Sequence, residues 1–455
     1  MMRPLTLSEL RLPLEGQLHG ADCDIFGVST DSRNVREGDL FVALRGEHFD
    51  GQEYVLQANS VGATAALVRQ SVTSSLSQLQ VADTQRALGL LGAYNRQQYK
   101  GPLIGITGSS GKTTVKNMVH AVLSRRGETL ATAGNFNNEI GVPLTLLRLR
   151  PEVEFAVVEM GAAKAGDIAW LCELASPTIA LLLNAMPAHL EGFGSVEGVA
   201  AAKGEIFDGL MKTDVAVINA DQSWARQWRK RASAATVVDF GLEQPASISA
   251  RSIQGMGVRG VSFTATTPIG DMSIRLNLPG AHNVANALAA VAVGLACEVS
   301  LTDIRDGLES LQPSDGRLRS TILPSGASII DDCYNANPGS VRAAIDMLST
   351  CSGQRTLLLG AMRELGHSSS ELHREIGAYA RAAGIDQLWG VGPELEICVD
   401  AFGAGGQFFE DRGAALVAIE RRFGEGDTVL IKGSRSAGME QILQALLTPI
   451  KAQEH

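Results

Sequence analysis

Three features that would assign the chain to a specialised class are missing from its sequence. No apolar run is long enough to span a bilayer, and the first residues show no long apolar stretch with a small-residue cleavage site, so we expect no membrane span and no export signal. The six cysteines are scattered without close pairs, which argues against a disulfide framework or a cysteine metal site and favours a reducing cytoplasm. Acidic residues outnumber basic ones, and the net charge of −10 provides no general positive field for nucleic acid.

What is present is a long chain with repeated strand and helix patterns. A chain of 455 residues is too long for one hydrophobic core, and its length suggests about three domains. Strand-like runs predict a small α/β domain over residues 1–100, in which the polar run 70–80 is expected to be a solvated turn or helix edge. Alternating strands and helices over 101–312 predict a parallel, doubly wound sheet, and a third, Rossmann-like α/β domain is expected over 313–455. The strand candidates are residues 39–44, 65–68, 103–107, 155–158, 178–183, 215–219, 328–331, 356–359, 387–390 and 428–431.

The most informative segment is a Gly/Ser loop that joins an apolar strand to an amphipathic helix. Gly108 and Gly111 allow backbone N–H groups to converge on phosphate oxygens at the positive end of the helix. Lys112 can reach the outer phosphates, and the Thr113 hydroxyl stands where a bridging Mg²⁺ ion would lie. The full phosphate-loop pattern has a glycine five positions before Gly111, and this chain has Ile106 there. The segment therefore predicts a nucleotide site of a shortened form, with an ordinary strand-to-helix turn as the alternative.

Three polar residues of the middle domain are candidates for a metal site. Glu159 closes an apolar strand, at the same sheet edge as the phosphate loop, and carboxylates suit Mg²⁺. His189 follows the next strand, although a lone loop histidine often has no role. Lys203 lies within an apolar helical stripe, where burial favours a neutral amine that can take up carbon dioxide as a carbamate. A lysine that extends to water along its stem is the alternative.

Two segments are rich in amide side chains. One is the turn that contains Asn135, Asn137 and Asn138, and the other opens the apolar helix after residue 280 with Asn283 and Asn286. At the helix start, Asn283 and Asn286 either cap the helix or hydrogen-bond a base or ribose, and the residues alone leave both roles open.

Taken in order along the chain, these motifs resemble the Mur ligases, which are ATP-dependent amino-acid or peptide ligases. The resemblance covers essentially the whole chain and is greatest to the members that add D-alanyl-D-alanine. It rests on Thr-Gly-x-x-Gly-Lys-Thr, Glu159, His189, Lys203 and His-Asn-x-x-Asn, and on the Asp-Asp-x-Tyr-Asn-Ala-Asn-Pro signature that starts at Asp331. The Asp-Asn-Pro-Arg motif of the diaminopimelate-adding relatives is absent. Cys333 and Ala361 depart from the usual Ser and Asp, which puts fine substrate contacts in doubt rather than the reaction.

The resemblance implies a reaction of peptidoglycan precursor synthesis. The terminal carboxylate of UDP-N-acetylmuramoyl-tripeptide attacks the γ-phosphate of ATP, and the amine of D-alanyl-D-alanine displaces the resulting acyl phosphate. A hinge near residues 313–317 would close the site against water. The implied partners are these small molecules, and we expect a cytoplasmic monomer.

The resemblance also assigns residues to each ligand. The catalytic residues are Lys112, His189 and Lys203. The ATP residues are Gly108, Ser109, Ser110, Gly111, Lys112, Thr113, Thr114, Asn138, Asn283, Asn286, Arg317 and Asp332. The ligands of two Mg²⁺ ions are Thr113 for the first, and Glu159, His189 and carbamylated Lys203 for the second. The substrate residues are Ser29, Thr30, Asp31, Ser32, Arg33, Phe49, Asp50 and Gly51 for the uridine nucleotide, and Asn335, Asn337, Lys432 and Ser434 for the dipeptide or peptide tail.

Three other functions fit the same phosphate loop. A phosphotransferase or nucleotide switch would transfer phosphate without forming an amide. Another ligase of the family, folylpolyglutamate synthase included, would use a free amino acid. A non-catalytic nucleotide-binding module is disfavoured because a full set of candidate metal ligands is present.

Overall fold

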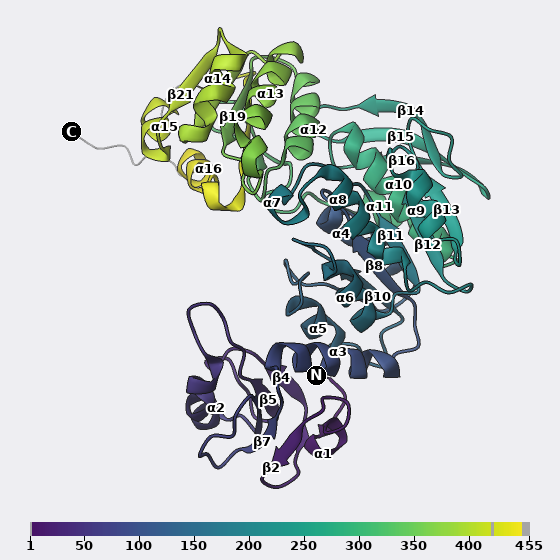
Figure 1. The fold of residues 1–455 in the computed structure, drawn as a ribbon. Coiled ribbons are helices and arrows are strands. Elements are labelled where there is room, and N and C mark those ends of the chain that lie inside the picture. Colours follow the sequence, from purple (N-terminus) through teal and green to yellow (C-terminus); the bar gives the residue numbers. More distant parts are fainter. Residues whose placement is uncertain (1, 420–422, 448–455) are drawn as a thin grey trace.

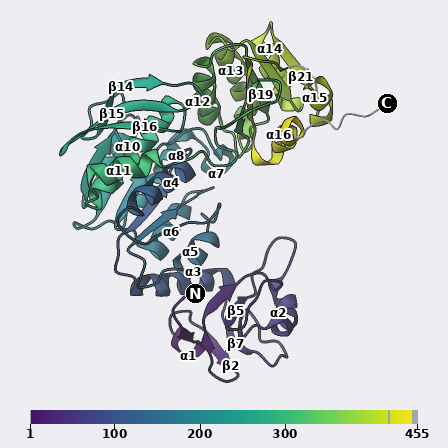
Figure 2. The same cartoon turned by 180° about the vertical axis from the view of Figure 1, so that it is seen from behind.

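The computed structural model describes residues 2–419 and 423–447. Its elements form three α/β units in chain order, with the N-terminal and C-terminal units at opposite ends of the middle unit (Figures 1 and 2). In these two stretches of the chain, no helix is long and apolar enough to cross a membrane.

The N-terminal unit is built on a mixed five-stranded sheet of order β2-β7-β6-β5-β4, in which β2 alone runs antiparallel to its neighbour. The strands are β2 (Gln17–His19), β4 (Gly27–Ser29), β5 (Asp39–Val42), β6 (Ala65–Val68) and β7 (Ser77–Gln80), and a small ladder joins β1 (Leu5–Thr6) to β3 (Asp24–Ile25). The helices are α1 (Leu7–Leu10), η1 (Gly51–Tyr54), α2 (Val55–Val61) and α3 (Thr84–Gln98). The prediction of a solvated turn or helix edge over 70–80 is wrong for β7, because Leu79 is fully buried in this sheet.

Helix α3 connects this unit to the middle one. The Asn95 amide donates to Leu146 O at 2.9 Å and Leu149 O at 3.1 Å, and the Arg96 guanidinium donates to Ala175 O at 2.7 Å. These buried bonds satisfy carbonyls of the middle unit's helices, and they fix α3 against it.

The middle unit contains a six-stranded parallel sheet of order β13-β12-β11-β8-β10-β9, as the alternation of strands and helices predicts. The strands are β8 (Leu103–Thr107), β9 (Thr129–Ala131), β10 (Phe155–Glu159), β11 (Ile179–Leu182), β12 (Val215–Asn219) and β13 (Thr236–Phe240). The helices are α4 (Lys112–Leu123), α5 (Gly141–Leu146), α6 (Asp167–Ala175), α7 (Leu190–Phe193), α8 (Val196–Lys203), η2 (Gly204–Phe207), α9 (Ala225–Arg231), α10 (Ala281–Ala296) and α11 (Leu301–Glu309).

Successive residues of these strands enter two different cores, as expected for a sheet covered on both faces. Ile104 and Ile106 pack with α4, α10 and α11, whereas Leu103 packs with α6, α8 and α9 on the other side. An antiparallel sheet of β14 (Ser249–Gly255), β15 (Val261–Thr267) and β16 (Gly270–Leu276) extends the first core. This sheet is absent from the sequence prediction.

The C-terminal unit has a second six-stranded sheet, of order β17-β18-β22-β19-β20-β21, with β17 antiparallel at one edge. The strands are β17 (Arg319–Ile322), β18 (Ser328–Asp332), β19 (Arg355–Gly360), β20 (Gln387–Val391), β21 (Gly406–Phe409) and β22 (Thr428–Lys432). The helices are α12 (Pro338–Ser349), η3 (Gly366–Ser368), α13 (Ser369–Ala382), η4 (Pro393–Leu395), α14 (Glu396–Phe402), α15 (Arg412–Ile419), η5 (Arg435–Ala437) and α16 (Glu440–Leu447). The carboxyl ends of β18 and β22 lie side by side, which brings Asp332 to Lys432.

Candidate active site

The phosphate loop lies between β8 and α4 and ends at a glycine with a left-handed backbone. Gly111 has φ +84°, and a Cβ there would lie 2.8 Å from Asn286 Oδ1. Helix α4 begins at the next residue, so its N-terminus and positive dipole end face the cleft. The Lys112 ammonium donates to Gly108 O at 2.7 Å, and burial lowers the pKa of this lysine. An anion bound here would therefore pair with an ammonium that burial has already desolvated.

Asn184 holds this loop in shape. Its Oδ1 accepts the Ser110 N–H at 2.9 Å, and its Nδ2 donates to Ser110 O at 3.1 Å. Its backbone carbonyl accepts the Ser109 N–H at 3.1 Å. Because Asn184 follows β11, the loop is fixed to the neighbouring strand before any ligand binds.

Glu159 is buried where the loop meets the end of β10. Its Oε2 accepts the Thr113 hydroxyl at 2.9 Å, and its Oε1 accepts the Asn137 amide at 2.8 Å. A hydroxyl and a carboxylate oxygen in contact, beside an anion site, are the hard oxygen ligands that Mg²⁺ prefers. Each of these two side chains is therefore suited to bind a magnesium ion.

A second buried lysine lies behind this carboxylate. Lys116 Nζ is 4.0 Å from Glu159 Oε2 and donates to Thr132 O at 2.9 Å, while the Thr132 hydroxyl accepts the Glu159 N–H at 3.0 Å. Burial lowers the pKa of Lys116, and the charge of Glu159 opposes that change. The lysine thus supplies a cation to a carboxylate that is almost fully removed from water.

His189 and Lys203 lie further along the same unit. His189 has φ +52°, and its Nδ1 faces the carboxylate of Glu364 from the C-terminal unit. Burial lowers the pKa of His189, with Glu364 opposing and the two lysines Lys112 and Lys203 adding to the decrease.

Lys203 is 1% exposed at the last residue of α8, where the helix tightens into η2 instead of continuing as predicted. Its ammonium lies 5.8 Å from the centre of the Phe193 ring, and no carboxylate pairs with it within residues 2–419 and 423–447. Burial and the nearby Lys112 hold its pKa well below the ordinary value. A lysine in this state favours the neutral amine, so the alternative in which it extends to water does not apply.

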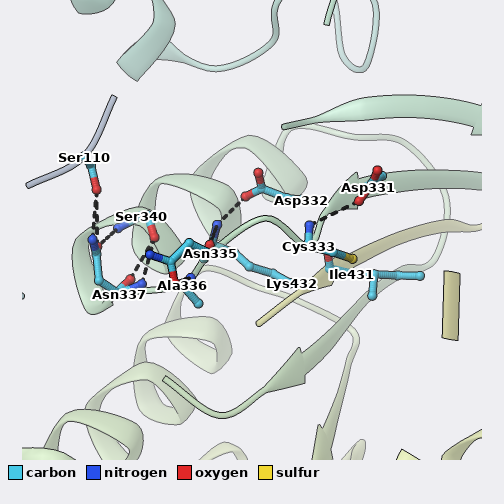
Figure 3. Close-up of polar contacts among 10 residues, drawn as sticks. All are labelled: Ser110, Asp331, Asp332, Cys333, Asn335, Ala336, Asn337, Ser340, Ile431 and Lys432. Atoms are coloured by element: carbon cyan, nitrogen blue, oxygen red, sulfur yellow. Dashed lines mark hydrogen bonds and ion pairs between the residues drawn. The ribbon is translucent and has the colours of Figure 1, made fainter. Parts of the chain in front are cut away.

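Several contacts cross from the middle unit to the C-terminal unit. Arg317 Nη2 donates to the Thr113 hydroxyl at 3.1 Å, and its guanidinium stacks 4.1 Å from the centre of the Tyr334 ring. Asn337 caps α12 and also donates to Ser110 Oγ at 3.0 Å (Figure 3). The phosphate loop and the start of α4 therefore touch the C-terminal unit through Ser110 and Thr113.

Asp332 and Lys432 form a buried pair beside these contacts. Lys432 Nζ lies 2.5 Å from Asp332 Oδ2 and donates to Asn335 O at 2.9 Å (Figure 3). Burial raises the pKa of Asp332, and the lysine opposes that change. The pair fixes the segment that follows β18 at the edge of the cleft.

The two units enclose a cleft of about 730 Å³. All residues expected to hold ATP line it except Gly108: Ser109, Ser110, Gly111, Lys112, Thr113, Thr114, Asn138, Asn283, Asn286, Arg317 and Asp332. Glu159, His189, Asn335, Asn337 and Lys432 line it too, whereas Lys203 and the buried Ser434 do not. Two of these amide groups already make structural hydrogen bonds, since Asn138 Oδ1 accepts the Gly141 N–H at 2.9 Å and the Asn283 amide donates to Pro279 O at 2.7 Å.

Comparison with known proteins assigns the family. Residues 24–88, 106–294 and 316–435 match the models described as Mur ligase family, catalytic domain; Mur ligase middle domain; and Mur ligase, glutamate ligase domain. A protein named UDP-N-acetylmuramoyl-tripeptide–D-alanyl-D-alanine ligase, from Escherichia coli (strain K12), is 44% identical over 98% of this chain and 99% of its own length. The chain belongs to the Mur ligase family.

Solved structures of Mur ligases share the whole fold. A crystal structure of MurF from Acinetobacter baumannii has a TM-score of 0.93 and 36% identity, and it covers 98% of this chain and 99% of that chain. The MurF ligase of Thermotoga maritima, solved in complex with ADP, has a TM-score of 0.82 and 30% identity over 92% of this chain and 96% of that chain.

In this Mur ligase, the N-terminal motif forms a separate polar surface. Asp31 accepts a bidentate contact from Arg33, at 2.9 Å and 2.8 Å, and this arginine lowers the pKa of Asp31 to about 2. Arg69 donates to Asp50 at 2.5 Å. The side chain of Arg33 is 78% exposed and Phe49 is 55% exposed, so a cation and an aromatic ring are presented to solvent. Of the other residues expected to bind the uridine nucleotide, the Ser29 hydroxyl donates to Asp31 O and the Ser32 hydroxyl donates to Gln57. Gly51 is the first residue of η1.

The usual metal-binding side chains do not form a group of three in the described part of this Mur ligase. Across the described residues, no three His, Cys, Asp or Glu side chains lie close enough to hold a metal ion.

Proposed function

We propose that this Mur ligase joins D-alanyl-D-alanine to UDP-N-acetylmuramoyl-tripeptide with hydrolysis of ATP to ADP and phosphate. The relative in Escherichia coli that carries this name is 44% identical over nearly the whole chain, and this observation carries the proposal. The ADP complex of the MurF ligase from Thermotoga maritima supports ATP as the nucleotide. The phosphate loop and the two-unit cleft provide the matching chemistry in this chain.

Binding of the triphosphate is assigned to the loop and its neighbours. The N-terminus of α4 and the Lys112 ammonium would bind the β- and γ-phosphates. Asn283 and Asn286 line the cleft behind the loop, on the side where the base or ribose would lie, and Arg317 and Asp332 would contact the nucleotide from the C-terminal unit. Because Arg317 also bonds Thr113, the nucleotide would lie between two units that already touch.

The reaction must bring a negative carboxylate onto a negative triphosphate. Thr113 would hold one Mg²⁺ ion, and Glu159, His189 and Lys203 would hold a second. Mg²⁺ at these positions supplies positive charge that offsets the repulsion between the two anions. Lys112 adds a fixed cation to the same region. Closure of the two units over the bound substrates would exclude water, which would otherwise hydrolyse an acyl phosphate.

Lys203 is assigned to metal binding as its carbamate. Its neutral amine adds to the carbon of CO₂ and releases a proton, which converts the neutral amine into a carboxylate-like anion. The absence of a paired carboxylate among the described residues supports this assignment, because burial beside Lys112 then favours the neutral amine, and a carbamate formed there would face the positive charge of Lys112.

The remaining ligands are assigned to the two outer units. Arg33 and Phe49, with the loop around Asp31 and the turn at Asp50, would bind the uridine nucleotide in the N-terminal unit. Asn335 and Asn337 are the remaining candidates for the dipeptide. Lys432 is already paired with Asp332, and Ser434 lies outside the cleft, so their assigned roles are indirect. We also propose that the protein acts as a monomer in the cytoplasm.

The test is release of phosphate from ATP with each substrate omitted in turn. The proposal predicts release only when both UDP-N-acetylmuramoyl-tripeptide and D-alanyl-D-alanine are present, together with a pentapeptide product. Release with the tripeptide and a free amino acid would identify another ligase of the family. Label transfer from ATP to an acceptor without an amide product would identify a phosphotransferase.

A further inference from the structure

One contact between the middle and C-terminal units has no role in the proposed reaction. The carboxylate of Glu364, in the loop after β19, contacts Nδ1 of His189, in the loop after β11. The side chains are 58% and 39% exposed, so the contact lies at the rim of the cleft and not in a core. The two loops follow strands of different units, so the folding of either unit alone does not require the two residues to meet.

The backbone on both sides is shaped for this contact. Glu364 has φ +61° and His189 has φ +52°, a left-handed conformation that is uncommon for residues with a side chain. The Leu190 N–H also donates to the backbone carbonyl of Glu364 at 3.1 Å. Strained backbone at both partners indicates that the surrounding structure holds them in place.

The loop that carries Glu364 is held by helix α13 of its own unit. Fully buried His373, on α13, accepts the Met362 N–H at its Nε2, at 3.1 Å. Its Nδ1 donates to Ser369 O at 2.8 Å. Both ring nitrogens are satisfied, so His373 fixes the loop to α13 and leaves the Glu364 carboxylate free to reach across the interface.

A histidine that binds a metal through one ring nitrogen commonly donates its other N–H to a carboxylate, which fixes the tautomer and the ring orientation. When Nδ1 donates to Glu364, the lone pair is on Nε2, and His189 lines the cleft. We propose that Glu364 is a positioning residue that orients His189 for the second metal ion, so that the C-terminal unit completes a metal site whose ligands all belong to the middle unit. This inference rests on the proposed function, since it requires a metal ion at His189.

A thermodynamic consequence follows. If metal affinity depends on the Glu364 contact, then metal binding must stabilise the arrangement of units that makes this contact by the same factor. The metal would hold the cleft closed over the phosphate loop without touching the C-terminal unit.

The test is Mn²⁺ binding to the full chain, saturated with the non-hydrolysable analogue β,γ-methylene-ATP and followed by electron paramagnetic resonance. Glu364→Ala removes the acceptor but keeps the Cβ and the backbone carbonyl that bonds Leu190. Glu364→Gln keeps an oxygen that can accept the His189 N–H. The matched control is Glu371→Ala, an exposed carboxylate of the same unit whose ion-pair partner is Arg374 at 3.8 Å.

We expect two classes of Mn²⁺ in the wild type. In Glu364→Ala one class should weaken by about 10- to 100-fold while the other is unchanged, because loss of an outer partner typically weakens metal binding by that factor. The Mn²⁺ affinity of that class in Glu364→Gln should lie between those of Glu364→Ala and the wild type, and Glu371→Ala should match the wild type. Equal affinity for both classes in Glu364→Ala, or equal weakening in Glu371→Ala, would overturn the inference. A wild type that binds fewer than two Mn²⁺ ions would instead remove the proposed second metal site, and this inference with it.

Discussion

Replacing Lys203 by methionine should separate stability from activity. The lysine is 1% exposed, lies against the Phe193 ring, and has no carboxylate partner among the described residues. Methionine has a similar length and volume without the charge, so the packing should be kept and the variant should be no less stable than the wild type. Activity should fall by at least about 100-fold, the usual effect of removing one group that stabilises charge in a transition state.

The pH dependence of stability gives an independent check in buffer without CO₂. Because burial lowers the pKa of Lys203, the unfolded wild type binds more protons than the folded one between that lowered pKa and the ordinary lysine value. Wild-type stability should therefore rise with pH in this window, by up to about 1.4 kcal/mol per pH unit, and the methionine variant should lack this contribution.

The carbamate itself is tested by chemical rescue. Lys203→Ala leaves space beside Phe193, so formate or acetate should restore part of its activity, whereas Lys203→Met fills that space and should not respond. Wild-type protein incubated with ¹³CO₂ should give a carbamate resonance that both variants lack. Normal activity in Lys203→Met would refute the reasoning, and so would a loss of activity that simply follows unfolding.

Three further changes are expected to act at separate points. Lys116→Met leaves the buried Thr132 carbonyl without its donor and should destabilise the protein by about 1–3 kcal/mol in urea unfolding; an unchanged midpoint would show that the bond is dispensable. Asn184→Ala removes both side-chain bonds to the phosphate loop and should weaken ADP binding by about tenfold in calorimetry, as expected for roughly 1.4 kcal/mol; unaltered affinity would mean that the loop is held by other contacts. Arg33→Ala should raise the pKa of Asp31 from about 2 toward its ordinary value in an NMR titration, and it should raise the KM for the uridine substrate but not for ATP. In the wild type this contact is present above the ordinary carboxyl pKa and is lost as the pH falls through about 2, so a variant that titrates like the wild type would contradict the assignment.

Local patterns predicted the central strands of the middle and C-terminal sheets. The predicted strands 65–68, 103–107 and 215–219 coincide with β6, β8 and β12, because a parallel strand covered on both faces gives a continuous apolar run. Strand β7 was missed, since only its two central residues are buried and its ends are polar. The antiparallel sheet of β14 to β16 was missed as well, because its solvent-facing residues interrupt the hydrophobic pattern.

The site was predictable where chemistry and local structure coincide. The phosphate loop precedes a helix in the sequence, so its role can be recognised without tertiary contacts. Lys116, Asn137 and Asn184 were not assigned as site residues, because their partners come from other segments of the chain. For Lys116, its position one helical turn after Lys112 could have indicated a role in the site. Residues four apart lie on the same side of a helix.

The contact between His189 and Glu364 has no sequence signal at all. The two residues are in different units, and their approach depends on how those units are arranged. Ser434 was assigned through the family resemblance, but the structure brings Lys432 to the cleft while Ser434 is buried and does not line it.

The central claim is that the cleft between the middle and C-terminal units activates a carboxylate as an acyl phosphate. Its most direct test uses UDP-N-acetylmuramoyl-tripeptide with ¹⁸O in the terminal carboxylate, together with ATP and D-alanyl-D-alanine. Attack of a carboxylate oxygen on the γ-phosphate, followed by displacement by the amine, must leave one labelled oxygen in the inorganic phosphate. We predict one ¹⁸O atom in each phosphate released. Unlabelled phosphate alongside the amide product would contradict the account.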